Sequence, residues 1–303
     1  MPSIWWVEGI SLQNISHSHC IMTVTWALVL GSHGLTNKTK ESKTMNQQLM
    51  KISIFSITWL FCFTTAVAHD VWLSAKWNAK KTQILVSPVV AETFPNGEQI
   101  KDMKRFNEPS VYFPDGRKLL FTGNPLDSTV LGSIPFSSSC IVSAAVKQRE
   151  ITYDQKIAWE YLTEEIGMSR EEAAKIITPG VKEFTETYSR NLKTLVAPSN
   201  VAPYDSAVGL PLEIVLVSWK DTPPHLATIQ FRLLDNGMPA PGSPVRVLSN
   251  GKATIVKTDS LGSATAIIDP EHPVLLAYIL LTKVDENRLK SVWTNLAIYR
   301  LGR

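Results

Sequence analysis

Residues 210–247, LPLEIVLVSWKDTPPHLATIQFRLLDNGMPAPGSPVRV, decide the fold class of this chain. Large apolar residues recur at every second position, first at Leu212, Ile214 and Leu216 and then at Ile229, Phe231 and Leu233, so each set lies on one face. A period of two residues is the signature of a half-buried β-strand. The Asp-Asn-Gly sequence at 235–237 then predicts a tight turn, so the segment is expected to fold as β-hairpins.

The same pattern continues to the C-terminus. A second turn is predicted at residues 258–262, a strand at 264–268, a fully buried strand at 274–281, and a last alternating strand at 293–299. Short strands at roughly 8–12-residue spacing, with turn signals between them, are typical of a β-sandwich. We therefore expect a C-terminal sandwich domain over residues 208–303.

Upstream, residues 69–150 also favour β structure. Val111 and Phe113 alternate with polar neighbours, residues 114–117 (Pro-Asp-Gly-Arg) predict a turn, and residues 118–121 return as the second arm of a hairpin. Cys140 precedes a run of small and β-branched residues and is interpreted as a buried apolar side chain. The segment predicts an N-terminal β domain.

Between these two domains, residues 151–199 change to a helical period and predict a helical insert. Residues 157–166 form an apolar face that ends at Gly167. A second helix is expected to begin at Ser169, because Glu172 three residues later completes a capping box. A third helix is predicted from the spacing of Phe184, Tyr188, Leu192 and Leu195. Glu186 and Arg190 would form a solvated pair on that helix.

Residues 45–68 have the organisation of a secretory signal peptide. Lys51 provides a positive start, residues 52–63 an apolar stretch, and residues 66–68 (Ala-Val-Ala) a cleavage site before His69. Residues 1–44 are interpreted as an extension from a start site assigned too far upstream. The alternative is a signal anchor or two membrane segments, but both apolar runs fall short of the ~20 residues that span a bilayer. The sequence thus predicts a periplasmic or secreted protein.

Composition narrows the functional classes. Charged residues make up 19% and hydrophobic residues 44%, with a formal net charge of +3, as in ordinary globular proteins. Lys and Arg do not interleave with aromatic residues in a stripe, so we expect no nucleic-acid partner. Cleavage before His69 would remove two of the three cysteines and leave Cys140, so no disulfide within the mature chain is expected.

The predicted new terminus carries the strongest metal-binding signal. A free α-amine and an imidazole on His69 would form a bidentate chelate for nickel or cobalt, with copper also suited. Asp70 could add an oxygen ligand or orient the histidine. His225 and His272 are the other two histidines of the mature chain and the remaining candidate ligands. Against this stands an interpretation of His69 as a frayed terminus and of His225 and His272 as surface-loop residues.

Signals for catalysis are weak. The sequence has no G-x-S-x-G elbow, P-loop, dinucleotide-binding fingerprint, H-E-x-x-H or C-x-x-C motif. We therefore predict that the chain is not an enzyme.

An ordered set of short motifs resembles a bacterial family of secreted proteins, the domain of unknown function 4198. The set comprises residues 69–73 (HDVWL), 161–165 (YLTEE), 186–193 (ETYSRNLK), 209–213 (GLPLE), 236–239 (NGMP), 258–262 (TDSLG) and Trp293. The resemblance implies a role beside the extracytoplasmic components of nickel and cobalt uptake, with an inner-membrane metal transporter as partner. It also implies a transthyretin-like, Ig-like C-terminal sandwich. Val71, where an aromatic residue is commoner, and the basic run at 76–81 depart from the pattern.

The expected fold is therefore mainly β, with two Ig-like or transthyretin-like β-sandwich domains and an α-helical insert between them. The leading functional hypothesis is a periplasmic divalent-metal-binding protein that assists nickel or cobalt uptake. The first alternative is a metal-free β-sandwich interaction module of the cell envelope. A copper oxidase that pairs His69 with a second histidine ranks last.

Overall fold

The computed structural model describes residues 6–7, 10–11, 70–80, 82–121, 132–135, 139–222 and 224–302. The chain divides into two units, residues 1–65 and 66–303. In the first unit, the described residues form the antiparallel pair β1 (Trp6–Val7) and β2 (Ile10–Ser11). The predicted signal peptide at 45–68, its cleavage site and His69 lie outside the described residues. Among the described residues, no helix is long and apolar enough to cross a membrane.

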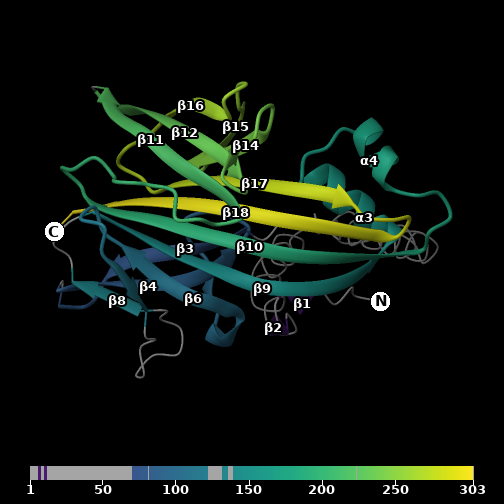
Figure 1. Ribbon diagram of the computed structural model, residues 1–303, viewed down its shortest axis with the longest axis horizontal. Coiled ribbons are helices and arrows are strands. Elements are labelled where there is room, and N and C mark those ends of the chain that lie inside the picture. Colours follow the sequence, from purple (N-terminus) through teal and green to yellow (C-terminus); the bar gives the residue numbers. More distant parts are fainter. Residues whose placement is uncertain are drawn as a thin grey trace, which may run out of the picture. The chain divides into compact units, whose positions relative to one another are not determined.

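The second unit is mainly β, as predicted, and is organised around one long sheet (Figure 1). Its eight strands, in spatial order, are β15 (Lys252–Lys257), β14 (Pro244–Ser249), β17 (Val274–Lys283), β18 (Arg288–Leu301), β10 (Glu183–Pro198), β9 (Cys140–Asp154), β6 (Phe106–Tyr112) and β7 (Lys118–Leu120). Strands β10 and β18 pair in parallel over the full length from Thr185–Arg288 to Pro198–Leu301. The sheet thus takes strands from all three segments predicted between residues 69 and 303.

Two smaller sheets pack against opposite sides of the long strands (Figure 1). One contains β11 (Leu212–Thr222), β12 (Leu226–Asp235), β13 (Met238–Pro239) and β16 (Ser263–Ile268). The other contains β3 (Asp70–Trp77), β4 (Gln83–Ala91), β5 (Glu98–Gln99) and β8 (Gly132–Pro135). Each small sheet buries an apolar face against the long sheet, which is the layered arrangement that hides the inner residues of an alternating strand.

The alternation around residues 210–247 is confirmed by burial. All six residues of the pattern are at most 4% exposed, and they share a core with Val245 and Val247 of β14. The predicted turn at 235–237 is present, with Asn236 and Gly237 at φ +48° and +79°, the left-handed values that a tight hairpin turn requires. The predicted hairpin β6–β7 is also present, with Tyr112 opposite Lys118.

The first two predicted helices are confirmed. They are α3 (Gln155–Glu160), which continues into η3 (Tyr161–Glu165), and α4 (Arg170–Ile176), while η2 (Met103–Arg105) is a short additional turn. The predicted capping box is complete, because Glu172 N donates to Ser169 Oγ at 3.2 Å and Ser169 N donates to Glu172 Oε2 at 2.9 Å. Gly167 ends the first helical segment at φ +76°.

The predicted third helix is wrong, because its residues form strand β10. Phe184, Tyr188 and Leu192 are four residues apart, and this spacing places side chains on one side of a strand as well as of a helix. The fourth residue, Leu195, packs in the core beside β11 and β12, whereas Phe184 packs beneath the helices. The segment forms a strand because its backbone hydrogen-bonds to a neighbouring strand on each side, β9 and β18.

Candidate functional site

The start of strand β3 is firmly anchored. Asp70 is 3% exposed, and Arg246 Nη2 donates to both of its carboxylate oxygens at 2.6 Å. The next carbonyl oxygen, of Val71, accepts from Asn295 Nδ2 at 2.6 Å. Asp70, the second residue after the predicted cleavage site, is therefore buried, and the first two residues of β3 are each held by a contact to the long sheet.

Strand β3 runs in the same direction as β18. Near its start, Val71 is hydrogen-bonded to Asn295, and at its end Trp77 Nε1 donates to the Gly302 carbonyl at 2.7 Å. The sequence separation of the two partners is nearly the same in both contacts, 224 and 225 residues, as expected for two strands that run in parallel. The part of β18 that comes before Asn295 carries Ser291 and Trp293 on the same face of the strand, since side chains alternate. The start of β3 therefore lies beside Asn295, two residues after Trp293 on β18.

His225 and His272 lie in exposed turns. His225 Nδ1 is 3.3 Å from Glu271 Oε1, and His272 Nδ1 is 3.0 Å from Asp269 Oδ2, with the two side chains 74% and 48% exposed. A backbone hydrogen bond from Glu271, together with the contact from His272, lowers the pKa of Asp269. The structure thus brings both histidines to carboxylates of one turn, residues 269–271.

That turn does not lie beside Asp70. His225 precedes β12, whose inner residues share a core with Val245 and Val247. Arg246 lies between these two valines, so its side chain points to the opposite face of the long sheet, where it meets Asp70. This placement gives no support to a site that joins the start of β3 to His225.

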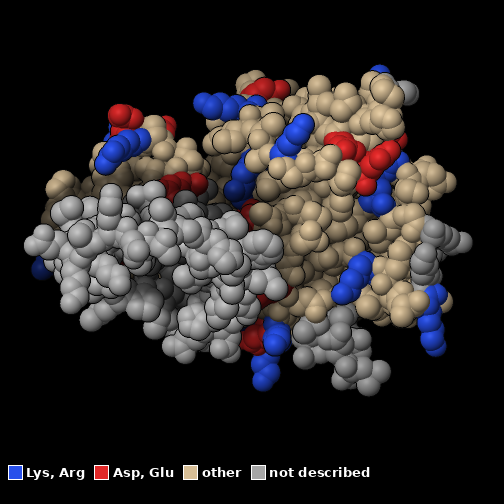
Figure 2. All heavy atoms as spheres, turned by 180° about the vertical axis from the view of Figure 1, so that it is seen from behind, with Lys and Arg blue, Asp and Glu red and all other residues tan. Residues whose placement is uncertain are grey.

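Among the described residues, no group of three or more His, Cys, Asp or Glu side chains could hold a metal ion. Both oxygens of Asp70 already accept hydrogen bonds from Arg246. Asp70 is therefore better suited to fixing the backbone than to binding a metal directly. In the view of Figure 2, the Lys and Arg side chains are interspersed with Asp and Glu.

A buried carboxylate lies beneath the helices. Glu186, on β10, is 4% exposed and accepts hydrogen bonds from Tyr153 at 3.0 Å and Tyr161 at 2.9 Å, and a third from Ser291 Oγ. Ser291 Oγ in turn accepts from Trp293 Nε1 at 3.1 Å. Burial, followed by the charge of Glu186, raises the pKa of Tyr161 well above its usual value. Three hydroxyl donors on one carboxylate satisfy a charge that would otherwise be costly to bury.

The predicted solvated pair of Glu186 and Arg190 is wrong. Arg190 is 9% exposed, and its guanidinium lies 4.3 Å from the ring centre of Trp293 and 5.8 Å from that of Tyr188. In a strand, residues four apart are separated by more than 12 Å, so the helical pairing distance does not apply. Arg190 instead makes cation–π contacts across the sheet.

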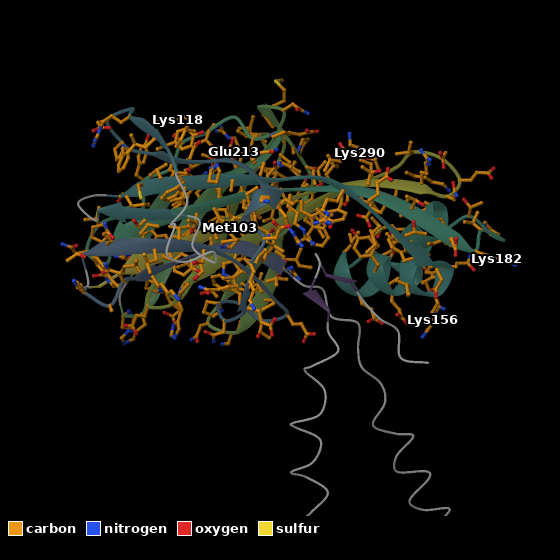
Figure 3. All side chains as sticks on the ribbon, turned by 90° about the horizontal axis from the view of Figure 1, so that it is seen from below. Met103, Lys118, Lys156, Lys182, Glu213 and Lys290 are labelled. Atoms are coloured by element: carbon orange, nitrogen blue, oxygen red, sulfur yellow. The ribbon has the colours of Figure 1, made fainter. Side chains whose placement is uncertain are left out.

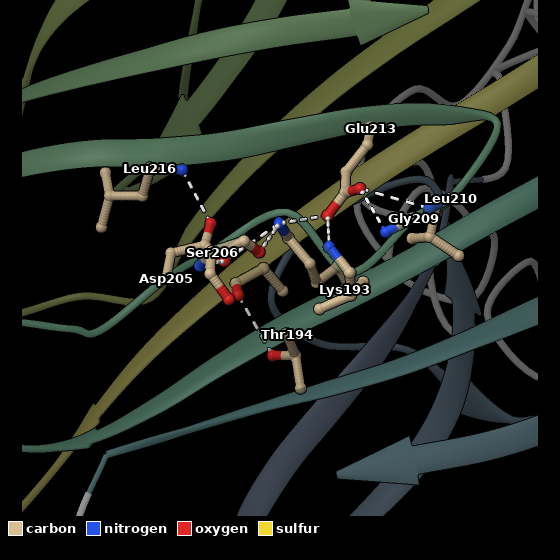
Figure 4. A network of polar contacts seen from close by, with 10 residues as sticks. Lys193, Thr194, Asp205, Ser206, Gly209, Leu210, Glu213 and Leu216 are labelled. Atoms are coloured by element: carbon tan, nitrogen blue, oxygen red, sulfur yellow. Dashed lines mark hydrogen bonds and ion pairs between the residues drawn. The ribbon is translucent and has the colours of Figure 1, made fainter. Parts of the chain in front are cut away.

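A second buried charged network joins β10, the connection 199–211 and β11 (Figure 4). Lys193 Nζ lies 3.0 Å from Asp205 Oδ1 and 2.9 Å from Glu213 Oε1. The exposed fractions of the three side chains are 2%, 0% and 2%. Glu213 also accepts backbone hydrogen bonds from residues 208, 209 and 210, which hold the connection in place.

Residues 66–280 match the family described as Domain of unknown function (DUF4198). The chain belongs to this family. The match includes strands β3 to β16 and most of β17. No curated protein matches the chain.

Sequence reasoning missed both buried networks of this DUF4198 protein. Glu186 and Lys193 lie in the segment predicted as a third helix, where Glu186 was expected to form a solvated pair with Arg190 and Lys193 was assigned no role. A strand interpretation of residues 183–198 would have placed Glu186 and Arg190 on one face and Lys193 on the other. The partners Ser291 and Asp205 have no local signal, because they meet β10 only through the sheet and the connection.

Proposed function

We propose that this DUF4198 protein is a periplasmic or secreted protein that binds a divalent transition metal through an amino-terminal His69 and assists nickel or cobalt uptake. The anchoring of Asp70 supports the proposal. A frayed terminus would make a poor chelate, whereas a terminus attached to a buried, ion-paired residue loses little further freedom on binding. The partner would be an inner-membrane metal transporter.

The proposed chelate uses two groups of a single residue, the α-amine and the imidazole of His69. An α-amine and an imidazole, with reference pKa values near ~7.7–8.0 and ~6.5, can both release protons to a metal at neutral pH. Nitrogen ligands favour cobalt, nickel and copper in rising order. Asp70 and Arg246 would hold the backbone, and the donors that complete the coordination would come from water or from residues outside the described ranges.

We also propose that the protein consists of two Ig-like, transthyretin-like β-sandwiches. Strands β11, β12 and β16 face β14, β17 and β18 across one core, which suits an Ig-like, transthyretin-like C-terminal sandwich. Strands β3, β4 and β8 would form the second sandwich with β6, β9 and β10. The two would share the long sheet, with helices α3 and α4 between β9 and β10 in the chain.

Calorimetry of protein that begins at His69 tests the proposal. Titrations with Ni²⁺, Co²⁺ and Cu²⁺ should show a single site, and one extra residue ahead of His69 should abolish it. His225→Ala and His272→Ala are matched controls and should leave the affinity unchanged. Equal affinity with and without the extra residue would refute the amino-terminal chelate.

A metal-free interaction module of the cell envelope is the second candidate. It is favoured by the finding that the described residues hold no cluster of three metal-ligating side chains. This function predicts a melting temperature that is the same with and without Ni²⁺. It also predicts that an envelope partner is recovered equally well by wild-type protein and by His69→Ala.

A further inference from the structure

Lys193, Asp205 and Glu213 meet in the apolar interior between the long sheet and β11. Lys193 extends from β10, Asp205 from the connection and Glu213 from the start of β11, and their contacts are 3.0 and 2.9 Å (Figure 4). Neighbouring residues of the same strands, Leu195 and Leu212, are fully buried in the apolar core. An amine nucleophile, a carboxyl group and a second carboxylate are therefore held together away from water.

The charges of this site do not balance. Two carboxylates face one ammonium, and the contacts described for these three side chains include no other cation. An excess buried charge is strongly unfavourable, and one of the acids is expected to take up a proton more readily than in water. Burial indeed raises the pKa of Asp205 to about 6. Moving the Lys193 proton to Asp205 would leave a neutral amine beside a neutral carboxylic acid.

Backbone donors surround the same carboxyl group. Leu216 N donates to Asp205 Oδ2 at 2.7 Å, and Ser206 N donates to Oδ1 at 2.7 Å. Fixed N–H donors of this kind stabilise the negative oxygen that develops when a nucleophile adds to a carbonyl carbon. Glu213 Oε1, 2.9 Å from Lys193 Nζ, is within reach of the proton that the nitrogen must lose.

We propose that Lys193 Nζ and Asp205 Cγ join in an intramolecular isopeptide bond, with Glu213 as the catalytic residue that carries the proton. The neutral amine attacks Cγ of the protonated carboxyl group and forms a C–N bond. Glu213 takes a proton from the nitrogen and returns it to the departing hydroxyl, so that the C–O bond breaks and one water leaves. An ammonium and a carboxylate are thereby converted to an amide and water, without oxidant or cofactor.

The bond would remove two buried charges and leave an amide N–H that can donate to Glu213. It would also close the chain between residues 193 and 205, covalently attaching the connection 199–211 to the central strand β10. Cys140 is the only cysteine after residue 68, so the mature chain has no disulfide of its own. An amide is a cross-link that does not depend on redox conditions.

Intact-mass spectrometry of the denatured wild-type protein tests the proposal directly. The expected mass is lower than the sequence mass by one water, and a protease digest should yield a branched peptide that joins Lys193 to Asp205. A wild-type protein at its full sequence mass would overturn the proposal, as would a dehydration that maps to other residues. This test involves neither His69 nor metal, so its failure is distinguishable from failure of the proposed function.

Variants assign the roles. Asp205→Ala and Lys193→Arg should retain the full mass, and Glu213→Gln should form the bond at least tenfold more slowly. Lys156→Arg is the matched control, because Lys156 makes an exposed pair with Glu160 at the helical end of the molecule, away from Glu213 (Figure 3). It should lose one water like the wild type. Bond formation at the wild-type rate in Glu213→Gln would refute the role of Glu213.

Discussion

Arg246 and Asp70 form an ion pair between two sheets, although 176 positions separate them in the chain. Arg246 Nη2 lies 2.6 Å from each carboxylate oxygen, and the side chains are 29% and 4% exposed. The pair attaches the first residue of β3 to β14, which is the second strand from one edge of the long sheet. The ion pair therefore fixes the start of β3 on the long sheet.

Removal of Arg246 should take away the cation that contacts both oxygens of the buried Asp70 carboxylate. Loss of one partner of a buried pair typically costs about 3–5 kcal/mol, and partial exposure of Arg246 places the expected loss near the lower value, about 3 kcal/mol. Urea unfolding of Arg246→Ala measures it. Arg232→Ala, an exposed arginine on β12, should change the free energy of unfolding by less than about 0.5 kcal/mol. Equal effects of the two substitutions would show that the Arg246–Asp70 pair does not stabilise the fold.

Replacing Glu186 should show how the helices are held on the sheet. In Glu186→Gln the three hydroxyls keep a weaker acceptor, and one amide N–H must face a donor, so a loss of about 1–3 kcal/mol is expected. Tyr161→Phe removes a single hydrogen bond and should cost about 1 kcal/mol. Urea unfolding again provides the measurement, with Glu150→Gln on the exposed part of β9 as control. A Glu186→Gln protein as stable as this control would show that the network contributes nothing.

Local patterns in the sequence were sufficient for much of this fold. Alternation gave β11, β12 and β16, and the capping box gave α4, because burial of one face and satisfaction of helix-end N–H groups are local requirements. They failed at β10. A central strand is covered on both faces, so its burial from Arg190 onward is continuous and its four-residue spacings fit a helix equally well.

The candidate site was less accessible to sequence reasoning. Asp70 was selected for its place beside His69, but its partner Arg246 could not be identified, since the pairing depends on the order of strands in two sheets. Glu186 was expected to be exposed, and nothing local marks Lys193 as buried, since charged residues rarely lie inside. Their burial becomes favourable only through Ser291 and Asp205, which approach from distant parts of the chain.

High pH should destabilise the protein through two buried tyrosines. Burial raises the pKa of Tyr299 to about 12, and burial together with the charge of Glu186 raises the pKa of Tyr161 well above the unfolded value near ~10. Between these values the unfolded chain loses protons that the folded chain keeps, so stability is full below pH ~10 and falls as pH rises. The expected slope is roughly 1 kcal/mol per pH unit for each tyrosine. Unfolding in urea at pH 9 to 11.5 tests this, and Tyr161→Phe should show about half the slope.

Cys140 should be inert in the folded protein. Its side chain lies at the start of β9, is 2% exposed, and has a pKa raised to about 12 by burial. The thiolate is the reactive form of cysteine, and both its low population and its lack of access suppress reaction. In protein that begins at His69, a thiol-specific chromogenic disulfide reagent at pH 8 should therefore label no cysteine in the native state and one in urea. Cys140→Ala provides the blank, and rapid labelling of the native protein would show that the start of β9 opens more readily than its burial indicates.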